Sequence, residues 1–156
     1  MGFGSDALSD DGLPIWLIRD LEAIFDRKEF EFAGSPVGGI ELLELLEGYD
    51  TAVLIDTQKT SRRKPGGIVE FTADNFEETF HLSSQHDVSF NEALRLANIM
   101  GISMPANIRI IAIEVAENKY LGFELSAQIR DKYPSILSYL CRVLNNIIGK
   151  DDEPVS

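Results

Sequence analysis

Two aspartates and a histidine, Asp11, Asp56 and His86, are the residues whose types and positions could build a common chemical site. Asp11 belongs to an acidic, glycine-rich turn, Asp56 closes an apolar run, and His86 lies in a polar segment ahead of an expected helix. Two carboxylates and an imidazole form a nitrogen and oxygen donor set that suits nickel, zinc or manganese. Three protein ligands leave positions open, which a catalytic or sensing metal site requires.

Each of these residues also has a simpler interpretation, which the sequence leaves open. Asp11 could cap the helix that follows it, because a carboxylate there accepts from free backbone amides. Asp56 could be a solvated acid at the end of a strand, and His86 a loop histidine that is hydrogen-bonded to a neighbour.

The remaining histidine and the lone cysteine are predicted to be structural. His81 lies between Phe80 and Leu82 in a stretch that reads like a strand. Cys141 lies among leucines at helical spacing, which is typical of a core thiol.

Four cations gather within six residues shortly after Asp56: Lys59, Arg62, Arg63 and Lys64. This cluster is either a solvated loop or a docking surface beside Asp56 for an acidic partner.

The elements that must position these residues alternate between strands and helices. Apolar residues at helical spacing, with Ser89 and Glu92 forming a capping box, predict helices over 13–28, 40–46, 90–100 and 126–148. Pro134 should kink or split the last one. Apolar or alternating runs predict strands over 29–33, 51–56, 67–72 and 108–115.

This alternation predicts an α/β fold: a three-layer sandwich with a mostly parallel twisted sheet and helices on both faces. Ligands bind beyond the carboxyl ends of such strands, where Asp56 and the turn carrying Asp11 would both lie. A turn of that kind should follow a central strand, yet only Met1 precedes Gly2. We therefore expect the first central strand to be missing from the chain, with residues absent upstream.

Composition narrows the class of protein. The 156 residues suffice for one domain, expected over 1–149 with a polar tail at 150–156. A net charge of −12 disfavours nucleic acid and anionic membranes as partners. No run reaches the roughly 18 apolar residues of a membrane span, and no signal peptide is evident. The single cysteine fits a reducing cytoplasm.

A dinucleotide-binding or flavodoxin-like module is an alternative, because Gly2, Gly4 and Ala7 match a loose Gly-x-Gly-x-x-Gly/Ala pattern. That pattern needs a helix to open within the motif, so that its amino end meets the phosphates. Here Gly12 and Pro14 delay the helix, and nearby aspartates would repel phosphate.

Several motifs in order resemble those of the hydrogenase maturation proteases, which trim the C-terminus of the large subunit of nickel-iron hydrogenases. Their opening Gly-x-Gly-Asn, then Asp-Asp/Glu-Gly, is similar to Gly2-Phe-Gly4-Ser5 followed by Asp10-Asp11-Gly12. Their apolar run closing on an aspartate resembles Val53-Leu-Ile-Asp56, and their Ser/His loop resembles Ser84-Gln-His86.

The resemblance implies a cytoplasmic, monomeric endopeptidase whose metal-contacting and catalytic residues are Asp11, Asp56 and His86. It implies a hydrogenase large-subunit precursor as partner, with Ni²⁺ carried by that substrate and other divalent cations able to occupy the site. The segment Gly34–Gly39 lacks the acid and threonine common in the family. This difference favours a rival interpretation, a non-catalytic metal- or partner-binding protein of the same fold. The presence of Asp11, Asp56 and His86 favours the enzyme, which is the leading interpretation.

Overall fold

The computed structural model describes residues 1–35, 41–76, 79, 81–82, 89–116 and 121–149. Its sheet has five strands in the order β2-β1-β3-β5-β4. They span Gly2–Phe3 (β1), Gly34–Ser35 (β2), Thr51–Gln58 (β3), Ile68–Thr72 (β4) and Asn107–Glu114 (β5). All neighbours are parallel except β4 and β5, which are antiparallel. The predicted mostly parallel sheet is confirmed.

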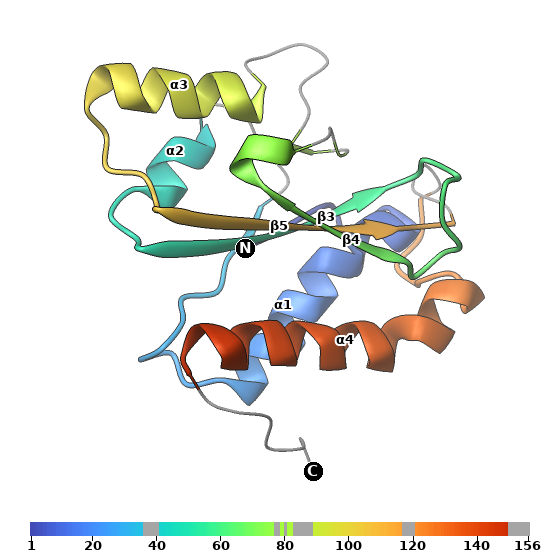
Figure 1. Ribbon diagram of the computed structural model, residues 1–156. Coiled ribbons are helices and arrows are strands. Elements are labelled where there is room, and N and C mark those ends of the chain that lie inside the picture. Colours follow the sequence, from blue (N-terminus) through green and yellow to red (C-terminus); the bar gives the residue numbers. More distant parts are fainter. Residues whose placement is uncertain (36–40, 77–78, 80, 83–88, 117–120, 150–156) are drawn as a thin grey trace.

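Helices cover both faces of this sheet (Figure 1). On one face, α1 (Leu13–Ile24) and α4 (Ala127–Ile147) pack on Ile55, Ile111 and Ile113. On the other, α2 (Glu41–Leu46) and α3 (Phe90–Met100) lie over the alternate residues of β3 and β5, such as Leu54 and Ile110. This division follows from the period of two along a strand, and it confirms the α/β sandwich.

The helix ends largely agree with the sequence. Ser89 Oγ accepts from the amide of Glu92, whose carboxylate accepts from Ser89 in turn, so the predicted capping box begins α3. Ser126 caps α4 by accepting from the amide of Ile129. Pro134 lies inside α4, which continues through it as one helix to Ile147.

The predicted strand over 29–33 is wrong. No strand is assigned to these described residues, and β2 begins only at Gly34. The alternation of Phe30 and Phe32 arises from a cluster of aromatic rings, in which Phe30 contacts both Phe25 and Phe32. These rings pack against the core residues of α1 and α4. The alternation of apolar residues at 30 and 32 therefore comes from side-chain packing and does not require a strand.

The expected gap at the first central strand is occupied by β1, although β1 is only two residues long. Gly2 pairs with Gly34 on one side and with Ile55 on the other, so β1 lies between β2 and β3. The glycine-rich turn therefore does leave the carboxyl end of a central strand. The predicted tail at 150–156 lies outside the described residues, and the single-domain boundary stays a prediction.

Candidate active site

The turn after β1 fixes Asp11 through close backbone packing. Gly4 has φ +154°, and a Cβ at this position would lie 2.0 Å from the carbonyl oxygen of Asp11. A side chain would therefore push the two backbones apart. Because they meet, the amide of Ser5 donates to Asp11 Oδ2 at 2.9 Å. In a phosphate-binding loop such an amide would face the phosphate; here it faces a carboxylate of the chain itself.

Adjacent aspartates in this turn have different roles. Both belong to the 3-10 helix η1 (Ser9–Gly12) and are buried. Asp10 Oδ1 accepts from the amide of Ser126, which joins the turn to the start of α4. Asp11 does not cap α1, whose N-cap residue is Gly12 and has no side-chain cap. The simpler interpretation of Asp11 as a helix cap is therefore excluded.

Asp56 is fully buried within β3, which excludes its interpretation as a solvated acid. Its carboxylate has five donors. Oδ1 accepts from the amide of Thr57 and contacts the ring Nδ1 of His81, both at 2.8 Å. Oδ2 accepts from Thr79 Oγ1 at 2.6 Å and from the amides of His81 and Leu82 at 2.8 and 3.1 Å. Asp56 therefore holds the whole 79–82 segment against the end of β3.

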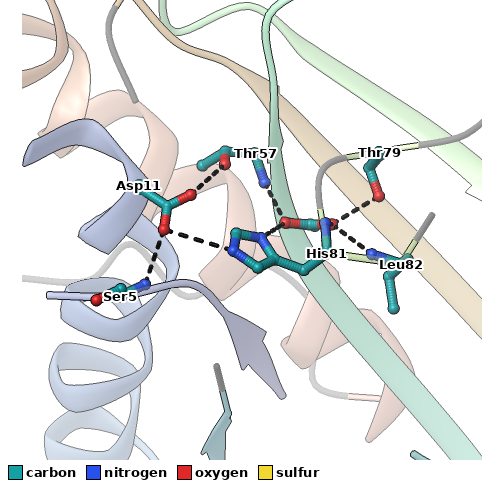
Figure 2. Close-up of polar contacts among 7 residues, drawn as sticks. Ser5, Asp11, Thr57, Thr79, His81 and Leu82 are labelled. Atoms are coloured by element: carbon teal, nitrogen blue, oxygen red, sulfur yellow. Dashed lines mark hydrogen bonds and ion pairs between the residues drawn. The ribbon is translucent and has the colours of Figure 1, made fainter. Parts of the chain in front are cut away.

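His81 lies between the two carboxylates (Figure 2). Its Nδ1 contacts Asp56 Oδ1 at 2.8 Å, and its Nε2 lies 3.4 Å from Asp11 Oδ2. Thr57 completes the cluster from β3, with Oγ1 3.4 Å from Asp11 Oδ1. The order along this chain of contacts is Asp56, His81, Asp11. A carboxylate that orients a histidine toward a further reactive group is a recurrent arrangement in hydrolytic sites.

The charge on His81 is set by opposing effects. Burial of the ring lowers the pKa of His81. Polar contacts with Asp11 and Asp56 and the negative charges of both carboxylates outweigh burial, and raise that pKa from 6.5 to about 10. The ring is therefore an imidazolium at neutral pH, between two carboxylates.

This charge predicts a pH dependence of stability. A group whose pKa is higher in the folded chain contributes stability that is complete below the unfolded value and lost as the pH rises through the folded value. The free energy of unfolding should therefore fall between about pH 6.5 and 10, more steeply in the wild type than in His81→Gln. Each unit by which the pKa of His81 differs between the folded and unfolded chain corresponds to about 1.4 kcal/mol in the free energy of unfolding. Urea unfolding of both proteins across this range measures it; parallel curves would contradict the imidazolium.

The donor types at this site suit a borderline metal such as nickel, since two carboxylates and an imidazole converge. Among the described residues, however, no three acidic, histidine or cysteine side chains already surround a common point as ligands. No ring nitrogen of His81 is directed at a shared metal position, because Nδ1 faces Asp56 and Nε2 faces Asp11. For His81 to ligate a metal ion through Nε2, the ring would have to lose a proton and its contact with Asp11.

Comparisons with known proteins identify the family to which the chain belongs. The family model of HycI, hydrogenase maturation protease, matches residues 15–143, a range that contains Asp56 and His81. The chain belongs to the hydrogenase maturation protease family. The recognition from short motifs is thereby confirmed, and with it the assignment as an enzyme of the maturation endopeptidase class. No curated protein sequence matches the chain significantly.

Solved structures of maturation proteases share the fold. The hydrogenase maturating endopeptidase HybD from Escherichia coli has a TM-score of 0.68 at 16% identity, over 93% of this chain and 90% of that one. HycI from Thermococcus kodakarensis KOD1 has a TM-score of 0.64 at 15% identity, over 93% and 90%. A hydrogenase 2 maturation peptidase from a Thaumarchaeota archaeon has a TM-score of 0.62 at 17% identity, over 92% of this chain and 94% of that one.

For this maturation protease, the structure joins two of the three residues singled out in the sequence. Asp11 and Asp56 lie at one cluster, but the histidine that links them is His81, which the sequence analysis treats as structural. His86 lies outside the described residues, so its predicted role stays a prediction. No local signal distinguishes His81 in the sequence, because its contacts are with Asp56, 25 residues earlier in the chain.

Other features of the maturation protease lie apart from this cluster. A cavity of about 370 Å³ lies beside Thr51–Val53, at the start of β3, and is lined mainly by apolar side chains together with Glu29, Glu31 and Asp50. Asp56 lies near the other end of β3. Cys141 is buried among leucines and aliphatic residues of α4, as predicted, and burial raises its pKa. Within the described residues, no helix combines the length and the apolarity needed to cross a bilayer.

Proposed function

We propose that this maturation protease cleaves a C-terminal extension from the nickel-loaded precursor of a hydrogenase large subunit, acting in the cytoplasm as a monomer. Family membership supports the class of reaction and of substrate. The observation that carries the assignment to a site is the contact chain from Asp56 through His81 to Asp11. In this proposal His81, rather than His86, completes the site.

The two carboxylates divide the work. Asp56 has its oxygens occupied by five donors, so it positions His81 and has little capacity to receive a substrate group. Asp11 has one contact at 2.9 Å and two at 3.4 Å, so its oxygens retain capacity for a further donor. Asp11 is therefore the carboxylate that accepts a proton from the water attacking the peptide bond.

His81 supports this role of Asp11 by its charge. The imidazolium Nε2 lies 3.4 Å from Asp11 Oδ2, and this ion pair helps to hold the carboxylate in place. Asp56 in turn fixes the ring so that Nε2 faces Asp11. The nickel belongs to the substrate in this account. Asp11, which retains capacity, supplies a carboxylate oxygen of a type that nickel accepts, so the loaded precursor is the form that this site distinguishes.

The experiment is to incubate the purified protein with a hydrogenase large-subunit precursor, prepared with and without nickel, and to follow cleavage on a gel. We expect the nickel-loaded precursor to be shortened and the nickel-free precursor to remain intact. A protein that binds the loaded precursor without shortening it would instead be the non-catalytic relative considered above. Equal cleavage of both forms would contradict the role given to nickel.

A further inference from the structure

A short basic loop interrupts the otherwise acidic surface of this protein. The loop, residues 59–64, carries four of the chain's 14 lysines and arginines and no acidic residue. All six residues are exposed. The rest of the chain has ten lysines and arginines against 26 aspartates and glutamates, so its net charge outside the loop is −16. The basic loop is thus a local reversal of sign.

This loop is anchored by a buried glutamate. Glu114, at the end of β5, is 2% exposed. Its Oε1 accepts from the amides of Thr60 and Ser61 at 2.6 and 2.7 Å, and its Oε2 accepts from Thr60 Oγ1 at 2.8 Å. Ser61 has φ +59°, a left-handed conformation that a non-glycine residue adopts at some cost. The carboxylate of Glu114 thus holds a conformation that the loop would not favour alone.

The backbone of Glu114 secures the far end of the same connection. Its carbonyl accepts from the amide of Gly66 at 2.7 Å, and its amide donates to the carbonyl of Gly67 at 2.8 Å. One residue therefore holds the connection between β3 and β4 at both ends. A merely solvated loop does not require a buried carboxylate with three donors, so the basic loop is a preorganised surface.

The basic loop lies at the same edge of the sheet as the proposed site. It follows β3 directly, and Lys59 comes three residues after Asp56. At about 3.3 Å per strand residue, the first cation lies roughly 10 Å along the chain from the site. Figure 1 shows the connection between β3 and β4 at the end of the sheet where α4 begins.

A hollow of about 440 Å³ adjoins the loop. It is lined by Arg62 and Arg63 together with Val69 and Phe71 of β4, and by Gln58 and Thr60. Two guanidinium groups beside an apolar strand surface suit carboxylates carried on a polypeptide, because Arg pairs with carboxylate oxygens while the peptide packs on the apolar side chains.

We propose that the basic loop binds an acidic stretch of the protein substrate and so directs the bond to be cut toward Asp11. This inference rests on the proposed function and adds a docking determinant to it. Charge selects the partner. A long polyanion such as DNA, or a vesicle surface, would also meet the rest of the chain, whose net charge is −16, whereas a short acidic segment can contact the loop alone.

The first test compares Arg62→Gln/Arg63→Gln with Arg27→Gln/Lys28→Gln, a pair of exposed cations beyond the far end of α1 that gives the same change in net charge. With the nickel-loaded precursor at low salt, the loop variant should lose about tenfold in kcat/KM with kcat unchanged, and the control should stay within twofold. At 0.5 M NaCl the difference should largely disappear because salt screens it. Equal kcat/KM in both variants would overturn the inference.

A second test is independent of cleavage, so that the inference and the proposed function fail separately. A fluorescein-labelled octaglutamate peptide should bind the wild type, bind Arg62→Gln/Arg63→Gln at least about tenfold more weakly, and bind the control like the wild type. Glu114→Gln should also weaken binding, since it loosens the loop. If the wild-type protein bound the peptide through the loop but did not cleave the precursor, the proposed function would be refuted and the docking inference would stand. No loop-dependent peptide binding, or tighter loop-dependent binding of a DNA duplex or phosphatidylserine vesicles, would overturn the inference.

Discussion

His81→Gln is expected to lower the rate of cleavage of the nickel-loaded precursor by roughly a thousandfold. Glutamine retains polar atoms but cannot carry the positive charge that lies 2.8 Å from Asp56 and 3.4 Å from Asp11. Asp11 would then lose both its charged neighbour and its fixed orientation. Single-turnover cleavage with excess protein measures this effect on the chemical step without a contribution from product release.

The matched control is His86→Gln, the other histidine of the chain. If His81 completes the site, His86→Gln should cleave within about threefold of the wild-type rate. The motif Ser84-Gln-His86, by contrast, predicts that His86 is the essential histidine. Full activity in His81→Gln together with loss of activity in His86→Gln would therefore restore that assignment and contradict ours.

Asp56→Asn is expected to cost about 3–5 kcal/mol in free energy of unfolding as well as abolishing cleavage. Removal of one partner of a buried ion pair leaves the other uncompensated, and here the other is His81. Asparagine would also turn an NH₂ group toward some of the donors, which include the amides of His81 and Leu82 and the hydroxyl of Thr79. Urea unfolding measures the loss.

Asp11→Asn separates the role in stability from the role in catalysis. Its amide oxygen can still accept from Ser5, and its other two contacts are long, so we expect a loss of less than about 1.5 kcal/mol. Cleavage should nevertheless be lost, because an amide cannot accept the proton. If both variants were equally destabilised, the division of work between the two carboxylates would be wrong.

Much of the fold and two-thirds of the proposed site were predictable because their signals are local. An apolar run that closes on an acid predicts a buried strand with the acid near its carboxyl end, and Asp56 is there. A glycine turn with paired aspartates ahead of a helix predicts an acid at the same edge, and Asp11 is there. Helix caps at Ser89 and Ser126 were equally local.

The choice of histidine was not predictable in this way. His81 joins the site through contacts with Asp56, which lies 25 residues earlier in the chain, and those contacts include two backbone amides that any residue could provide. Its apolar neighbour Leu82 suggests a strand but instead anchors the segment in the core. The two-residue β1 is likewise too short for a periodic signal, and only its pairing with β2 and β3 defines it.

The most direct test of the central claim is the intact mass of the nickel-loaded large-subunit precursor after incubation with the purified wild-type protein. We predict the loss of a single peptide from the C-terminus, complete with wild type and absent with His81→Gln. An unchanged mass with the wild-type protein, or the same product with His81→Gln at the same rate, would contradict the claim that Asp11, His81 and Asp56 form the catalytic site of an endopeptidase.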